Sequence, residues 1–233
     1  MAKKHMKRIA APFAWMVERK AGKFIARPRG SFSFGTGMPL MTVIKDVLGL
    51  VETRKEGKRV LNSRDVFVNG VRRKDEKFMV GLMDLLSLKD LGKTYRVLFD
   101  TNGVLRLVPV SDSDASVHLC RINGKRIIGK GKVQLSLHDG RSIIGSNDYR
   151  TGDSLVLSTQ DTGVKGHVRL ESGCYAYLIG GSNVGRMGVV ASISGSNVII
   201  RIGDASVEAA KRFVFPVGKE KPLISIAVKE KTK

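Results

Sequence analysis

The chain has few of the residues that build covalent or metal-based scaffolds. Only two of its 233 residues are cysteines, Cys120 and Cys174, and they lie far apart and in no C-x-x-C pair. This excludes a disulfide framework and a cysteine zinc site, and it fits a reducing compartment. The four histidines show no metal-ligand spacing. We therefore expect no bound metal.

Long apolar runs are also missing. No stretch approaches the roughly 18 apolar residues that a membrane helix needs, so no membrane-spanning segment is expected. The amino terminus is basic and then apolar, like a targeting signal, but Pro12 interrupts the apolar run and Arg19 and Lys20 follow directly. No small-residue cleavage site lies beyond Val17. We therefore interpret this segment as a basic arm and not as a targeting signal.

Acidic residues are scarce relative to basic ones. Lysine and arginine total 41 against 21 aspartates and glutamates, a formal net charge of +20, while 42% hydrophobic residues suffice for a core. The basic residues gather in residues 1–30, 45–77, 121–150 and the last 33. Solubilising lysines scattered over a surface are the alternative explanation, but they do not account for so large an excess. The charge predicts contact with a polyanion along several faces, as with a large folded RNA.

No segment of the sequence matches a catalytic or nucleotide-binding motif in full. Residues 180–187 have the spacing of a phosphate-binding loop but end in Gly-Arg-Met, without the lysine and hydroxyl that the loop requires. Residues 129–131 begin a dinucleotide fingerprint, but Gln134 stands where the third glycine belongs. Nothing assembles an acid, a base and a nucleophile. We expect neither an enzyme nor a small-molecule substrate.

Residues 1–38 are predicted to form a basic, extended arm. Its aromatic rings could stack on RNA bases or fix the arm to the rest of the protein, and for Trp15 both remain open. These rings are Phe13, Trp15, Phe24, Phe32 and Phe34. The candidate RNA-binding residues of the arm are Lys3, Lys4, Lys7, Arg8, Arg27 and Arg29.

Residues 39–100 are predicted to form a small α+β domain. Apolar residues at helical spacing between Pro39 and Gly49 indicate a first helix. A polar second helix is expected over 53–62, although Gly57 weakens it by about 1 kcal/mol relative to alanine. Short β-rich runs around Asn69-Gly70 then predict a tight hairpin.

This helix–helix–hairpin pattern, with "VFVNGVRRKDEKFMVGLMDLLSL", resembles the alpha-L RNA-binding module. The resemblance implies that a basic helix face and the hairpin grip an RNA backbone, and phosphate contacts of this kind set affinity and register. An ordinary α+β domain with a charged face is the alternative. The candidate residues are Arg54, Lys55, Lys58, Arg59, Arg64, Arg72, Arg73 and Lys74.

From residue 78 onward, short apolar runs separated by turn dipeptides predict small antiparallel barrels. The expected strands are 84–88, 95–99, 104–110, 117–122, 133–137, 142–144, 154–157, 167–170, 175–179, 188–193 and 197–202. We divide this part into a central β domain (101–171), an SH3-like barrel (172–215) and a tail (216–233). The candidate RNA-binding residues of the central domain are Lys125, Arg126, Lys130 and Lys132.

The segment "GCYAYLIGGSNVGRMGVV" resembles a KOW motif. Its glycines would permit positive φ and let an RNA backbone approach closely, and Arg186 would project from the turn. Asn183-Val184 departs from the more basic turns usual in such motifs. A tight barrel corner without a ligand is the alternative.

Taken together, the chain resembles the archaeal and eukaryotic small-subunit ribosomal protein family four, e type. The resemblance is carried by "KKHMKRIAAPFAWM", "RPRGSFSFGTGMPL", "LCRINGKRIIGKGKVQLSLHDGRSI", the KOW-like segment and "FVFPVGKEKPLISI", in that order. It implies a mostly β, α+β cytoplasmic protein bound to small-subunit ribosomal RNA and to neighbouring ribosomal proteins, with no catalysis and no cofactor. The alternatives are an RNA-modifying enzyme and a transiently bound translation factor with a KOW motif.

Overall fold

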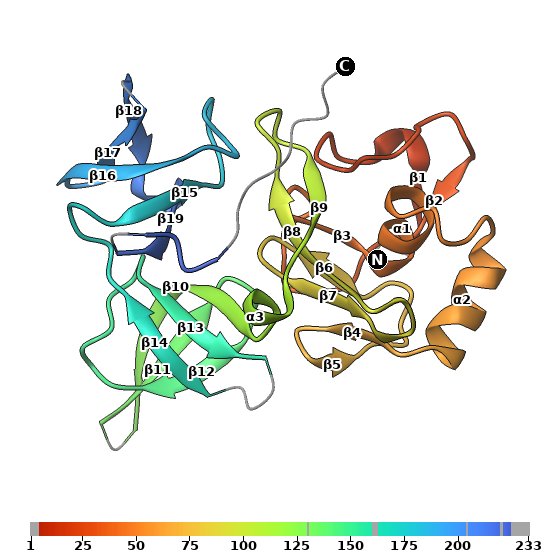
Figure 1. The fold of residues 1–233 in the computed structure, drawn as a ribbon, viewed down its shortest axis with the longest axis horizontal. Coiled ribbons are helices and arrows are strands. Elements are labelled where there is room, and N and C mark those ends of the chain that lie inside the picture. The colour runs from red at the N-terminus through yellow and green to blue at the C-terminus, as the bar shows by residue number, and fades with distance from the viewer. Residues whose placement is uncertain (1–4, 130, 160–162, 204, 220, 225–233) are drawn as a thin grey trace. The chain divides into compact units, whose positions relative to one another are not determined.

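The computed structural model describes residues 5–129, 131–159, 163–203, 205–219 and 221–224. The chain forms two compact units, which we call unit 1 (residues 1–98 and 104–112) and unit 2 (residues 99–103 and 113–233). The fold is α+β and mostly β, as expected, with α1 and α2 in unit 1 and strands in both units (Figure 1). Within the described residues, no helix is long and apolar enough to cross a membrane.

Unit 1 contains the two predicted helices. The first runs as α1 (Leu40–Thr42) and continues as the π-helical turn η2 (Val43–Val47). Leu40, Val43 and Ile44 are fully buried along one face, and Gly49 takes a φ of +63° just past the end. The apolar spacing and the terminal glycine therefore located this helix correctly.

The second helix, α2 (Arg54–Ser63), is confirmed and is better supported than its sequence suggested. The Thr53 hydroxyl accepts a hydrogen bond from the Glu56 amide at 3.2 Å and caps the helix. Gly57 is buried, and a Cβ there would lie 2.6 Å from the Sδ atom of Met41. The glycine that lowers helix propensity is what allows α2 to pack closely against α1.

The main sheet of unit 1 has the strand order β5-β4-β7-β8-β9. Asn69 (φ 51°) and Gly70 (φ 78°) make the tight turn between its first two strands, as predicted. The strands are β4 (Val66–Val68), β5 (Val71–Arg72), β7 (Leu85–Leu88), β8 (Lys93–Phe99) and β9 (Leu105–Pro109), with the 3-10 turn η3 (Lys89–Leu91) after β7. Two small sheets accompany it, β1 (Met6–Lys7) with β2 (Phe24–Ile25) and β3 (Gly37–Pro39) with β6 (Met79–Gly81).

The amino-terminal segment is not a fully extended arm over its described residues. β1 pairs with β2, so the chain folds back on itself around the 3-10 turn η1 (Arg8–Ala10). Trp15 is buried, and its indole Nε1 donates to the carbonyls of Phe34 and Gly37, both at 2.9 Å. The structure therefore supports the second of the two roles open for Trp15, which is to fix this segment to its own unit.

Unit 2 contains two five-stranded antiparallel sheets. The first has the order β12-β11-β10-β13-β14 and the second the order β18-β17-β16-β15-β19. The first comprises β10 (Val117–Ile128), β11 (Lys132–Leu137), β12 (Ser142–Gly145), β13 (Ser154–Ser158) and β14 (Val164–Val168). The second comprises β15 (Tyr175–Leu178), β16 (Met187–Ser194), β17 (Asn197–Ile202), β18 (Ala205–Ala210) and β19 (Val214–Gly218). Two short helical turns, α3 (Asp112–Ala115) and η4 (Lys211–Phe213), precede β10 and β19.

The turn between β8 and β9 belongs to unit 2, although both strands pair in unit 1. The Tyr177 hydroxyl accepts from the Phe99 amide at 2.8 Å and donates to the Phe99 carbonyl at 2.9 Å. Burial raises the pKa of this phenol far above its usual value. The chain thus passes from one unit to the other three times, near residues 98, 103 and 112.

Candidate nucleic-acid interface

The four cations of α2 lie on its exposed side. Gly57 and Leu61 are buried, whereas the side chains of Arg54 and Lys58 are 53% and 54% exposed. Lys55 and Arg59 are also exposed. The helical period therefore separates an apolar face, which packs against the unit, from a basic face that is open to a ligand.

The hairpin brings a second group of cations beside this helix. The Arg72 Nη2 donates to the carbonyls of Asn62 and Arg64, at 3.3 and 3.4 Å, where α2 ends. The Arg73 guanidinium lies 4.2 Å from the centroid of the Phe78 ring. We call the combined set the helix–hairpin surface, defined as Arg54, Lys55, Lys58, Arg59, Arg64, Arg72, Arg73 and Lys74.

Carboxylates neutralise part of the helix–hairpin surface. Glu76 accepts from Arg54 Nη2 at 2.5 Å and lies 3.4 Å from Lys58 Nζ. Arg64 pairs with Asp90 and Arg72 with Asp65, both as exposed pairs worth little in water. By contrast, Lys55, Arg59 and Lys74 form no ion pair with any described residue. These three are the cations most available to a phosphate.

The Glu76 pair predicts an acid-sensitive step. The hydrogen bond from Arg54 outweighs burial and lowers the pKa of the Glu76 carboxyl. Its stabilisation is therefore complete above the unfolded pKa, about 4.3, and is lost as the pH falls through the lower folded value. We expect Glu76→Gln to cost about 1 kcal/mol at pH 7, because both cationic partners are half exposed, and to flatten the loss of stability below about pH 4.5.

Thermal melts from pH 3 to 7 measure this effect. Glu18→Gln, an exposed position in the same unit, gives the same change of charge and should keep the wild-type acid profile. Superimposable profiles for Glu76→Gln and wild type would contradict the assigned pair.

The amino-terminal candidates separate into different environments. Arg8 is buried, and its Nη2 lies 2.6 Å from an Asp46 carboxylate oxygen, so it holds the segment in place and is not displayed to a ligand. The burial and the ion pair of Arg8 argue against the predicted RNA contact, and the sequence did not reveal them because Asp46 is 38 residues away. Lys7 and Arg29 are exposed, and Arg27 is half-buried over the Phe34 ring. Lys3 and Lys4 lie outside the described residues.

A hollow of about 260 Å³ is lined by residues of both the amino-terminal segment and α2. Arg27, Arg54 and Lys77 line it together with the exposed ring of Phe24. His5 meets that ring edge-on, with centroids 5.7 Å apart. An exposed ring among cations offers both a stacking surface for a base and charge for its phosphate.

The glycine-rich turn between β15 and β16 has the predicted positive φ at Gly181 and Gly185, but several of its glycines lie against the protein itself. A Cβ at Gly185 (φ 80°) would lie 2.5 Å from the Asp100 carbonyl, and one at Gly180 would lie 2.5 Å from the Phe213 ring. A Cβ at Gly188 would lie 2.4 Å from the Arg201 carbonyl oxygen. These glycines therefore serve close packing inside unit 2. Arg186 remains exposed and donates to Asn183.

The candidates of the first sheet of unit 2 lie at the end of a long hairpin. Lys125, Arg126 and Lys132 are exposed on β10 and β11, and Lys125 Nζ donates to the Asn147 carbonyl at 2.5 Å. Lys130 lies outside the described residues. These positions form a second basic region, separate in sequence from the helix–hairpin surface.

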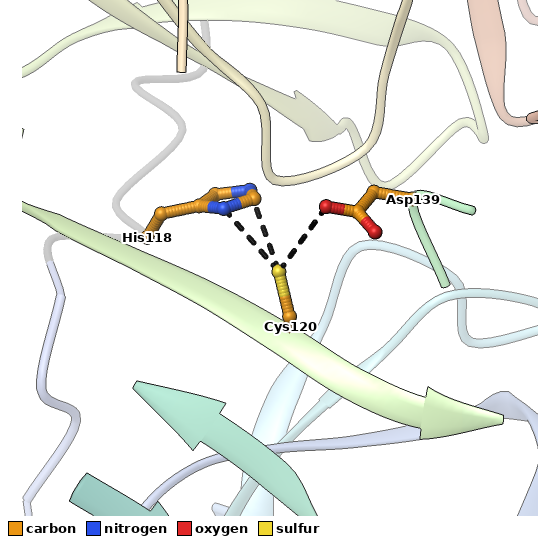
Figure 2. A group of neighbouring side chains, drawn as sticks. All are labelled: His118, Cys120 and Asp139. Carbon is orange, nitrogen blue, oxygen red and sulfur yellow. Dashed lines mark hydrogen bonds between the residues drawn. The ribbon is translucent and has the colours of Figure 1, made fainter. Parts of the chain in front are cut away.

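A cluster that sequence spacing did not reveal lies at the other end of β10. His118 and Cys120 share one face of the strand, and Asp139 reaches them from the turn after β11 (Figure 2). Their ligand atoms lie within 4.8 Å of one another, as in a metal site. However, the Arg141 guanidinium contacts all three, at 2.7 Å from His118 Nδ1, 3.4 Å from Cys120 Sγ and 2.5 Å from Asp139 Oδ2.

Arginine already supplies the positive charge of that cluster. Although burial opposes ionisation, the Arg141 charge holds the pKa of the Asp139 carboxyl below its usual value. A metal ion would have to displace this guanidinium or lie against it. The cluster is therefore an arginine-centred network that links β10 to the β11–β12 turn.

Known protein families match three successive segments of this chain. Residues 2–30 match the RS4NT (NUC023) domain, residues 38–86 the S4 domain and residues 91–164 the ribosomal family S4e. The chain is 37% identical to small ribosomal subunit protein eS4 of Methanocaldococcus jannaschii, over 96% of this chain and 98% of that one. It is 35% identical to the eS4 protein of Archaeoglobus fulgidus, over 98% and 100%.

A solved structure shares the fold. The crystal structure of the 30S ribosomal protein S4e from Thermoplasma acidophilum superposes with a TM-score of 0.71 at 30% sequence identity. The match covers 82% of this chain and 99% of that one. The helix–hairpin surface falls wholly inside residues 38–86, the stretch that matches the S4 domain.

Proposed function

Because the chain belongs to the ribosomal S4e family, we propose that it is a structural constituent of the small ribosomal subunit that binds and stabilises ribosomal RNA. In this role it works in the cytoplasm, and its partners are small-subunit ribosomal RNA and neighbouring ribosomal proteins. It has no catalytic part and needs no cofactor. The observation that carries the proposal is the helix–hairpin surface, where mostly exposed cations gather on a helix and a hairpin within the S4-matching residues.

The binding mechanism is electrostatic. Each lysine or arginine that neutralises a phosphate releases a condensed counterion, and this release drives association. Such contacts set affinity and orientation without reading sequence, so shape complementarity to a folded RNA supplies the specificity. In this proposal, further cations extend the RNA contact beyond the helix–hairpin surface. They are Lys7, Arg27, Arg29, Lys125, Arg126, Lys132 and Arg186.

Salt-dependent binding tests the proposal. We expect the full-length protein to bind a small-subunit ribosomal RNA transcript and to lose about 10³-fold or more in affinity between 50 and 200 mM salt, as expected for six or more phosphate contacts. A large-subunit transcript fragment of equal length is the matched control and should bind more weakly. An affinity for the small-subunit transcript that changes less than tenfold over this range would refute the proposal.

A further inference from the structure

A basic hollow in unit 2 is lined by three cations that are not among the candidate RNA-binding residues named from the sequence. It encloses about 540 Å³ and is lined by Arg121 of β10, by Lys211 and Arg212 of η4, and by the β16–β17 turn at Gly195-Ser196. None of the described residues that line it is acidic. Three cations from segments about 90 residues apart in sequence therefore face one space in which the structure describes no carboxylate.

The Arg121 guanidinium is held in a fixed orientation. Its Nη1 donates to the carbonyls of Arg212 and Val214, at 2.6 and 3.1 Å, and its Nε and Nη2 donate to Asn123 Oδ1, at 3.2 and 3.0 Å. All these acceptors are neutral. Burial lowers the pKa of this guanidinium, as expected for a cation that is desolvated without a counter-ion.

The other two cations are also positioned by their surroundings. The Arg212 guanidinium lies 4.7 Å from the centroid of the Phe213 ring. The Lys211 amide donates to the Ser196 carbonyl at 2.8 Å, and a Cβ at Gly152 would lie 3.3 Å from Lys211 Cε, so the lysine stem passes over that glycine. None of the three cations forms an ion pair with a residue that the structure describes. An anion entering the hollow would meet oriented donors and little competition.

We propose that this hollow binds a backbone phosphate of the ribosomal RNA, which makes η4 and the adjoining β10 an RNA-contacting part of unit 2. The inference rests on the proposed function and adds to it a site of stated chemistry. Guanidinium groups match the geometry of phosphate oxygens and hold them by charge-assisted hydrogen bonds. A phosphodiester would give Arg121, Lys211 and Arg212 the negative counter-charge that no described carboxylate in the wall supplies.

A double substitution that removes two of the three positive charges tests the site. Lys211→Gln with Arg212→Gln leaves Arg121 and its structural hydrogen bonds in place. We expect the salt dependence of RNA binding, as log affinity against log salt, to become shallower by about 1 to 2, because one or two phosphates are no longer neutralised. Lys165→Gln with Arg201→Gln removes two exposed charges of unit 2 elsewhere and should keep the wild-type slope.

Chemical protection of the lysine gives a second readout that needs no variant. In the full-length complex, acetylation of Lys211 by a soluble acylating reagent should slow at least several-fold, while that of Lys165 stays unchanged. If wild type binds RNA with a steep salt slope but Lys211 is unprotected and both pairs behave alike, the hollow is not an RNA site. If wild type shows no salt-dependent binding at all, the proposed function fails instead.

Discussion

Replacing Lys55, Arg59 and Lys74 together by glutamine is expected to weaken RNA binding about 10²-fold at 0.1 M salt. Each of these exposed cations lacks an ion-pair partner among the described residues, so each can release one counterion on binding. A slope of about 0.7 to 0.9 per phosphate contact corresponds to about a sixfold change in affinity per contact at this salt concentration. Because none of the three holds the fold together, the melting temperature should stay within about 2 °C of wild type.

A charge-matched variant separates a local site from general attraction. A triple variant with Lys93→Gln, Lys165→Gln and Arg201→Gln removes three exposed charges that are not among the candidate RNA-binding residues. We expect this variant to keep most of the wild-type affinity and salt slope in fluorescence anisotropy titrations. Equal losses in the two triple variants would mean that RNA is attracted by net charge alone, and the helix–hairpin surface would lose its assigned role.

Replacing Trp15 by alanine is expected to cost about 3–5 kcal/mol of unfolding free energy. The ring is only 3% exposed, and its Nε1 satisfies two backbone carbonyls that would otherwise be left without this donor. For a unit of this size, the loss corresponds to a drop in melting temperature of about 10 °C or more. Phe13→Ala, at a ring that is 71% exposed, should change stability by less than about 0.5 kcal/mol.

Trp15 is the single tryptophan of the chain, so the Trp15→Ala variant cannot be followed by tryptophan fluorescence. Circular dichroism follows unfolding in the variant, which has lost the fluorophore. In wild type, tryptophan fluorescence reports the environment of this ring directly, and it should show little quenching when RNA is added. Strong quenching on RNA binding, together with a mild effect of Trp15→Ala on stability, would place the ring on a base instead of inside unit 1.

Local signals in the sequence were enough to predict most of the elements. The apolar spacing between Pro39 and Gly49 corresponds to an observed helix. The Asn69-Gly70 turn corresponds to an observed hairpin. By contrast, β19 was missed because Pro216 within it argues against a strand. In the structure Pro216 lies opposite Ala176, next to an irregularity in the register. β18 was missed because its alanines and glutamate favour helices over strands.

The candidate site was predictable only in part. Helical period and turn chemistry place the cations of α2 and the hairpin at the surface, and both are local properties. What removes a cation from the site is a partner distant in sequence, as with Arg8 and Asp46, 38 residues apart. The hollow at Arg121 depends on β10 meeting η4, which a single sequence does not reveal. The five-part division into domains likewise stays a prediction.

The loop contributed by residues 99–103 limits how this protein can be dissected. A fragment that begins at residue 113 would lack the Phe99 backbone groups, leaving the buried Tyr177 hydroxyl without both of its partners. A fragment that ends at residue 112 would instead carry those five residues away from their neighbours. Recombinant halves are therefore poor substitutes for the intact polypeptide. During synthesis, Phe99 joins the growing chain 78 residues before Tyr177, so this short piece of the second unit must wait for its partner.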